Sequence, residues 1–195
     1  MYRMRIARQA LLGVVLTGSL VAATVWLLPY VGVPVSAGPL ERVNAHGTAL
    51  DDFRVGDRFT YGLNTVTLTG ADSATITDVQ VVGLDDGIRF LGARLGGPNR
   101  DIGSWQILPS WPPVHPGVDL RPLNTPITAK SADPIGWELF LGFEITRPGT
   151  FTSEGWQVTY RSGGRTYRST IPAFIRVCVP RPGQPKPPCP VPNPI

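Results

Sequence analysis

The chain is poor in the residue types that carry most catalytic and metal-binding chemistry. Its 195 residues include two cysteines, two histidines and two methionines. It contains no Ser-x-x-Lys, His-Glu-x-x-His or phosphate-loop motif, and no Gly-x-Ser-x-Gly nucleophile elbow follows residue 36. His46 and His115 have only nearby aspartates as companions, which falls short of the ligand set of a catalytic zinc. The sequence therefore predicts no metal site, no cofactor and a non-catalytic role.

Charged residues are absent between Arg8 and Glu41. Within this gap residues 10–31 are almost wholly apolar, and at about 1.5 Å per helical residue they can cross a hydrocarbon core of about 30 Å. Three arginines and no acid precede the apolar run, so the positive-inside rule places residues 1–9 in the cytoplasm. We therefore predict a single-pass protein of the cell membrane that contacts the bilayer through residues 10–31 and carries its C-terminal domain outside.

A cleaved signal is the alternative to this signal-anchor helix. Val35-Ser36-Ala37 is an acceptable small-x-small site, and cleavage after Ala37 would release a secreted domain. The apolar run is longer than a signal needs, however, and Trp26 and Tyr30 lie where an interfacial aromatic belt would form. No cysteine near the segment could accept a lipid, and no twin arginine is present.

The exported part of the chain is almost neutral. Three of the 18 basic residues are Arg3, Arg5 and Arg8, which leaves 15 basic against all 14 acidic residues. A nucleic-acid partner would require a clustered basic face, and this balance argues against one. The remaining candidate partners are a protein or another component of the cell envelope.

Cys178 and Cys189 lie close together near the C-terminus. In an oxidising compartment such a pair predicts one local disulfide. A zinc pair or a redox-active pair is less consistent with the spacing, since neither cysteine has a neighbouring Cys or His and the pair is not Cys-x-x-Cys.

The pattern divides the chain into a linker at 32–50, one strand-rich domain at 51–179 and a Pro-rich tail at 180–195. Seven or eight short strands with Gly and Pro between them predict an all-β fold. We expect an antiparallel two-layer β-sandwich, immunoglobulin-like in architecture and preceded by the transmembrane helix. A small β-barrel is the alternative.

Individual strands are visible as apolar residues at alternate positions. Residues 137–145 show the clearest period of two, which predicts a half-buried strand with Glu138 and Glu144 on its polar face. A change of parity between Ile76 and Val79 predicts a bulge. The other predicted strands are 58–62, 65–69, 74–82, 88–95, 156–160, 166–171 and 174–179.

A two-residue turn at Gly163-Gly164 fixes the register of one predicted hairpin. Ser162 then lies opposite Arg165, and counting back along both strands gives the other pairs. Tyr160 faces Tyr167, Val158 faces Ser169 and Trp156 faces Ile171. The apolar residues stay on one face in this register, which supports it.

Residues 104–134 form a long segment with many prolines, which forbid a helix and limit strand pairing. Its tryptophans argue against disorder. Two interpretations remain open. The segment is either a crossover that places its apolar side chains over an open sheet edge, or a recognition loop that contacts a partner through Trp105, Trp111 and His115. An exported hydrolase with its site in this segment is the alternative function.

Overall fold

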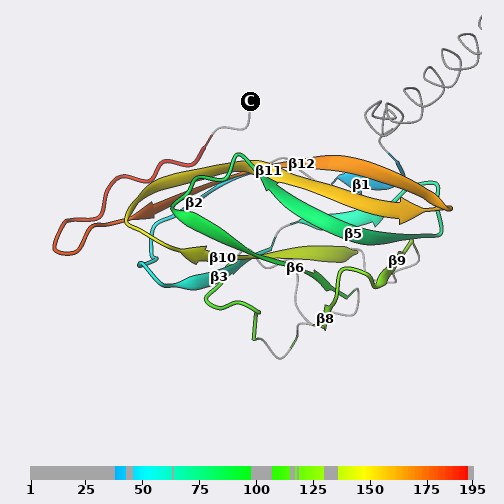
Figure 1. Ribbon diagram of the computed structural model, residues 1–195, viewed down its shortest axis with the longest axis horizontal. Coiled ribbons are helices and arrows are strands. Elements are labelled where there is room, and N and C mark those ends of the chain that lie inside the picture. The colour runs from blue at the N-terminus through cyan, green and yellow to red at the C-terminus, as the bar shows by residue number, and fades with distance from the viewer. Residues whose placement is uncertain are drawn as a thin grey trace, which may run out of the picture. The chain divides into compact units, whose positions relative to one another are not determined.

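The computed structural model describes residues 38–42, 46–62, 64–97, 107–114, 117, 119–129 and 136–192. The predicted membrane segment 10–31 and the cleavage site after Ala37 lie outside these residues, and so do Trp105 and His115. All regular structure in the described part is β (Figure 1). The strands are β1 (Leu40–Arg42), β2 (His46–Leu50), β3 (Arg58–Tyr61), β4 (Thr65–Leu68), β5 (Ser73–Val82), β6 (Ile88–Gly96), β7 (Ile107–Leu108), β8 (Leu120–Arg121), β9 (Pro126–Thr128), β10 (Trp137–Ile145), β11 (Gly149–Ser162) and β12 (Arg165–Val179).

Two curled sheets share one apolar core. In the first sheet β10 is central: β6 pairs with one side of it, while β4 and β3 pair end to end with the other. The second sheet has the order β2-β12-β11-β5-β9. Figure 1 shows β5, β11 and β12 in one layer and β3, β6 and β10 in the other. The expectation of an all-β domain is confirmed.

The β11–β12 hairpin has the register that the sequence predicts. Tyr160 pairs with Tyr167 and Trp156 with Ile171. Gly163 and Gly164 both have positive φ, at 55° and 76°, which suits the two-residue turn. The predicted bulge in β5 is also present, because the register against β11 shifts at Thr77.

The predicted linker at 32–50 is wrong at its C-terminal end. Residues 40–42 pair with β4 as strand β1, and residues 46–50 pair with β12 as strand β2. Leu40 and Leu50 are buried in the core. The sequences of these strands show no period of two. Pairing with distant strands holds them in place, which a local pattern does not reveal. The β2–β12 pairing is also parallel, which departs from the expected antiparallel arrangement.

Strand β10 is buried on both faces and not, as its pattern predicts, on one. Glu138 and Phe140, which belong to the supposed polar face, are 0 % exposed. Glu144 keeps partial exposure at the end of the strand. The alternation of apolar residues reports the core face correctly, but it cannot report that a second layer of chain covers the other face.

One long strand, β12, replaces the two predicted strands at 166–171 and 174–179. Pro172 lies between them and has no N–H to donate. The partner strand accommodates it with a bulge: the register shifts between Ser153 and Gly155, and Gly155 pairs with Pro172. Gly155 has a φ of 140°, which favours glycine. The ladder therefore continues through the proline.

The segment between β6 and β10 pairs with three strands of the two sheets. Its short strands β7, β8 and β9 pair with β3, β6 and β5 respectively. Leu108 and Ile127 are buried. In its described part this segment therefore covers sheet edges with apolar side chains, as the first of the two interpretations expects.

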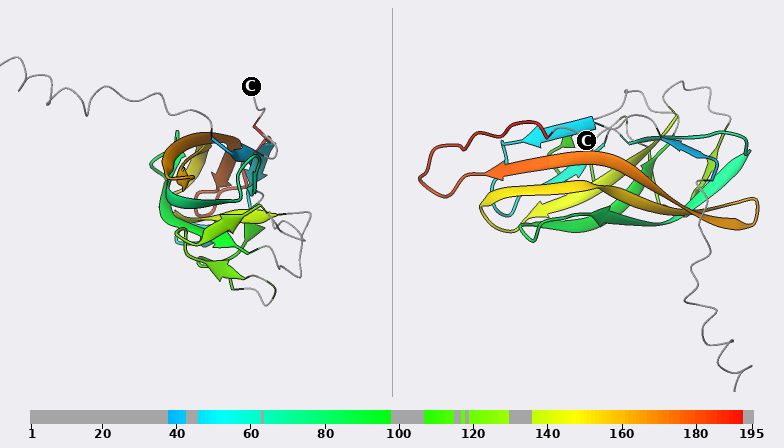
Figure 2. Two further views of the ribbon diagram at one scale, coloured as in Figure 1. Left: turned by 90° about the vertical axis from the view of Figure 1, so that its right-hand side faces the viewer. Right: turned by 90° about the horizontal axis from the view of Figure 1, so that it is seen from above.

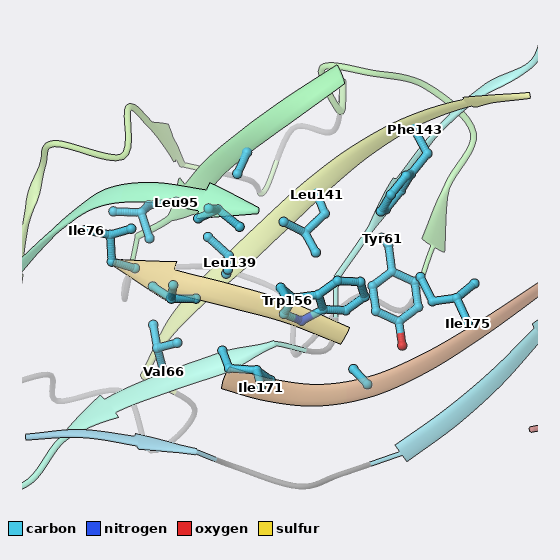
Figure 3. Packing of buried hydrophobic residues seen from close by; sticks show 14 of the residues in the cluster. Tyr61, Val66, Ile76, Leu95, Leu139, Leu141, Phe143, Trp156, Ile171 and Ile175 are labelled. Carbon is cyan, nitrogen blue, oxygen red and sulfur yellow. The ribbon is translucent and has the colours of Figure 1, made fainter. Parts of the chain in front are cut away.

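A buried hydrogen-bond group links the two sheets through Asn64, which lies between β3 and β4. Asn64 is 1 % exposed and its Oδ1 accepts from Trp156 Nε1 of the opposite sheet at 2.8 Å. Its Nδ2 donates to Leu139 O at 3.2 Å, and Leu139 N donates to Asn64 O at 2.9 Å. The Trp156 ring packs against Tyr61, with centroids 5.4 Å apart (Figure 3). Hydrogen bonds and ring packing therefore both hold Trp156 of the second sheet against the first sheet. We call this contact the junction.

The tail folds back over the second sheet and is held there by a disulfide between Cys178 and Cys189, as predicted. Arg176 Nη1 donates to Pro190 O at 2.8 Å. Lys186 Nζ bonds Asp52 and Asp51 at 2.7 and 3.0 Å, and these hydrogen bonds raise the pKa of Lys186. In Figure 2 the red C-terminal segment passes the end of β12 and turns back. Together these contacts fasten the described tail to β12 and to the residues that follow β2.

Replacing Asn64 with leucine tests the junction. Asn64→Leu leaves the indole N–H of Trp156 and the carbonyl of Leu139 without partners in a dry core, so we expect the free energy of unfolding to fall by about 2–4 kcal/mol. Urea denaturation of the purified protein measures this. The exposed Asn124→Ala is the control and should stay within about 0.5 kcal/mol of the parent. Equal effects of the two substitutions would contradict the assignment.

Candidate functional site

Of the three predicted binding residues, the structure describes Trp111. Its side chain lies on the outer face of the first sheet, over a row of small residues. Thr60, Gly142 and Gly92 are neighbours in this row on β3, β10 and β6. A Cβ added to Gly142 would overlap the indole of Trp111, and one added to Gly92 would contact it. The ring is partly exposed. We call Trp111 and these three residues the tryptophan shelf.

The backbone next to Trp111 is tied directly to the sheet. Thr60 is 0 % exposed and its Oγ1 donates to Ser110 O at 2.5 Å. The hydroxyl of Ser110 lies 3.3 Å from Pro112 O, to which it donates. Val114, a few residues later, is 88 % exposed. The segment is therefore fixed at Ser110 and presents an apolar side chain to solvent close to a partly exposed tryptophan.

A charged cluster is centred on Glu144, two residues after Gly142 of the shelf on β10. Glu144 Oε2 accepts from Arg89 Nη2 at 2.6 Å and lies 3.4 Å from Arg58 Nε. The hydrogen bond from Arg89 holds the pKa of Glu144 below its ordinary value, and the charges of both arginines act in the same direction. Both arginine side chains are more than half exposed. Two guanidinium groups share one carboxylate, so the cluster carries a net positive charge.

Further along the segment, Arg121 covers the other tryptophan of this sheet. Its guanidinium carbon lies 5.4 Å from the ring centroid of Trp137, which is 3 % exposed. Arg121 Nη2 and Nε also bond Asp119 Oδ2, at 2.5 and 2.9 Å. Arg121 thus contacts both Asp119 and the Trp137 ring, and Asp119 is bonded to Arg121. These contacts indicate a structural role for the pair.

A shallow hollow of about 370 Å³ lies at another edge of the domain. Phe53, Ile107 and Pro109 provide apolar walls, and Asp51 and Asp52 lie at its margin. Lys186 of the tail occupies both carboxylates. The hollow is therefore an apolar surface whose two acids are both bonded to one lysine, which leaves a net charge of one negative unit at its margin. Within the described ranges, no three His, Cys, Asp or Glu side chains gather as a metal site would require.

The structure places Trp111 as a cover of the sheet, which the sequence leaves open. Its role in binding stays a prediction, as do the roles of Trp105 and His115, which lie outside the described residues. Sequence reasoning missed Arg58 and Arg89, because only the pairing of β3, β10 and β6 brings them to Glu144. A glycine inside an otherwise apolar strand at Gly142 was the signal for close approach by another group.

Comparisons with known proteins give no family. No protein-family model matches the chain, and no curated protein matches it. Among the residues that the structure describes, no helix is long and apolar enough to cross a membrane.

A double-mutant cycle tests the contact between Trp111 and Gly142. Trp111→Ala and Gly142→Ala should each lower the free energy of unfolding by about 1–3 kcal/mol, through lost burial and through overlap respectively. The loss of unfolding free energy in the double variant should be smaller than the sum of the two single losses by about 1 kcal/mol or more. Removing the indole removes the overlap that the new methyl group would otherwise make. Thermal and urea unfolding measure all four proteins.

Gly96→Ala provides the matched control for this cycle. A Cβ at Gly96 would overlap Phe140 and not Trp111. Its effect should therefore add to that of Trp111→Ala within about 0.5 kcal/mol. Additivity of Gly142→Ala with Trp111→Ala would show that the indole does not lie on Gly142.

Proposed function

We propose that this protein is an exported, membrane-anchored binding or assembly module without catalytic activity. The observation that carries the proposal is the disulfide between Cys178 and Cys189. Such bonds form and persist outside the cytoplasm, and they are rare inside it. The apolar segment 10–31, with its N-terminal arginines, supplies the means of export and a single-pass anchor with the N-terminus in the cytoplasm. Cleavage after Ala37, giving a secreted domain, is the alternative.

Within this proposal the domain is an immunoglobulin-like sandwich. The strand order supports it. In one sheet β1, β3 with β4, β10 and β6 take the places of strands A, B, E and D of such a domain, and in the other β5, β11 and β12 take those of C, F and G. The disulfide differs from that of antibody domains, because it joins the last strand to the tail.

The tryptophan shelf and the arginines beside it form the proposed binding surface. Tryptophan and arginine are the residue types that most often carry binding energy at protein interfaces. Trp111 is held by the sheet, so it loses little conformational freedom when a partner binds. Arg58 and Arg89 give the surface a net positive charge, and Val114 adds exposed apolar area. We therefore propose a protein or other cell-envelope partner that presents apolar and acidic groups together.

Cell fractionation tests the anchoring. The full-length chain should sediment with membranes, resist extraction by alkaline carbonate and dissolve in detergent. Protease added to cells with a permeable outer envelope should digest the domain. Non-reducing gels should show Cys178 and Cys189 oxidised. A full-length chain in the soluble lysate with reduced thiols would contradict the proposal, and a mature N-terminus at Gly38 would select the secreted alternative.

Site-specific photo-crosslinking in intact cells tests the binding surface. A photoreactive amino acid at Val114 should give a specific adduct with a partner, whereas the same group at Val191 should not. Both valines are exposed, but Val191 lies on the tail. Adding Arg58→Ala and Arg89→Ala to the Val114 probe should reduce the adduct about tenfold. The unfolding temperature is measured in parallel, because the Glu144 side chain is only 16 % exposed and loses both partners. Equal adducts from both valines would remove support for this surface.

A further inference from the structure

The structure fixes the point at which the chain enters the domain. The first described residue, Gly38, lies against the rings of Tyr160 and Tyr167, and an added Cβ would overlap both. Leu40 N donates to Tyr160 Oη at 3.2 Å, and the tyrosine rings stack with centroids 5.4 Å apart. These tyrosines face each other on β11 and β12, close to the turn at Gly163-Gly164. The turn and the start of the domain are therefore at the same end (Figure 1).

The proposed anchor keeps this end close to the bilayer. Six residues, 32–37, lie between position 31, the end of the predicted membrane segment, and Gly38. The seven Cα-to-Cα steps from 31 to 38 span at most about 25 Å when fully extended. The turn lies three residues beyond Tyr160, about 10 Å at the rise of a strand. The hairpin tip, residues 160–168, is thus within reach of the membrane surface whenever the chain is anchored.

Three arginines give the hairpin tip an unbalanced positive charge. Arg161, Arg165 and Arg168 are all exposed, and no ion pair joins any of them to another residue in the described ranges. The pair Gly163-Gly164 has no side chains that would hold the turn away from a surface. The tip therefore presents exposed guanidinium groups around a bare backbone turn.

Nearby acids do not neutralise the hairpin tip. On the outer face of β5, Asp78 lies two strands from Arg168, with Thr159 between them, and accepts a hydrogen bond from Gln80. Asp72 is exposed in the turn before β5 and forms no ion pair within the described ranges. Elsewhere Arg147 pairs with Asp86 and Lys186 with two aspartates. Arg54, Arg94 and Arg181 form no ion pair within the described ranges, but they lie on separate segments. The hairpin tip instead gathers three unpaired cations on one turn, at the end where the chain enters.

We propose that the hairpin tip docks on the anionic phospholipid headgroups of the bilayer that holds the anchor. The inference rests on the proposed anchoring at residues 10–31. A basic side chain close to an anionic surface strengthens attachment by about fivefold. Three such contacts would bind a detached domain weakly, but the short tether makes docking effectively intramolecular. Docking orients the domain, so that the tryptophan shelf is held at a defined height and direction above the membrane.

Hydrogen exchange on the full-length chain in lipid nanodiscs tests the docking. We expect the amides of the turn, residues 162–166, to exchange at least fivefold more slowly in discs with 30 mol % phosphatidylglycerol than in discs of phosphatidylcholine alone. The amides of the turn at residues 83–87, at the opposite end, should exchange equally in both. Salt at about 0.5 M should remove the difference, because it screens surface charge.

Matched charge variants make the result specific. Arg161→Gln/Arg165→Gln/Arg168→Gln should bring the exchange rate in anionic discs to the neutral-disc value. Arg54→Gln/Arg94→Gln/Arg181→Gln removes the same charge from exposed positions elsewhere and should keep the protection. Equal unfolding midpoints in neutral discs check that both variants are folded. Loss of protection in both, or no protection in the parent, would overturn the docking.

Flotation separates this inference from the anchoring on which it rests. The parent chain and the tip variant should both float with neutral phosphatidylcholine vesicles in 0.5 M salt, because the anchor requires no surface charge. Failure to float would overturn the anchoring. Flotation together with identical turn exchange in anionic and neutral discs would overturn the docking alone.

Discussion

The hydrogen bond from Trp156 to Asn64 is the constraint from which the arrangement of the first sheet follows. A tryptophan this deep in the core needs an acceptor for its indole N–H, and Asn64 provides it from the opposite sheet. To do so Asn64 leaves the regular ladder, and the chain divides there into β3 and β4. Both pieces stay in register on β10 because the same asparagine also bonds the backbone of Leu139.

The outer faces of the two sheets differ in how far they are buried. Trp111 of the segment between β6 and β10 lies on the first, and Glu138 and Phe140 on the same face of β10 are buried although they point away from the core. On the second sheet, β5, β11 and β12 expose polar side chains such as Thr170 and Gln80. The partly exposed Trp111 and the Arg58–Glu144–Arg89 cluster both belong to the covered sheet, whereas the unpaired arginines of the hairpin tip belong to the second sheet. This asymmetry is what gives the domain one distinctive face.

Local patterns predict most of the central strands, and non-local pairing explains what they miss. The hairpin register follows from two glycines, the β5 bulge from a change of parity near Thr77, and the disulfide from the proximity of two cysteines. Strands β2, β7, β8 and β9 have two to five residues, and residues far away in sequence hold them. The charged cluster at Glu144 has the same cause, since its arginines come from two other strands. The sequence of a strand shows the periodicity of its own side chains. It does not show which distant segments pack against that strand.

The tail covers one strand edge with which a partner of the proposed binding module could otherwise pair. An exposed edge strand can pair with a partner's backbone, and β2 is one edge of the second sheet, with β9 as the other. The tail occupies this edge: a Cβ on Gly47 would overlap the carbonyl of Pro192, and Cys189 Sγ lies 3.6 Å from Leu50 O. The disulfide keeps the tail there under oxidising conditions. With β2 covered, the proposed partner would bind through Trp111 and the charged side chains beside it, and specificity would then depend on shape and charge at that face.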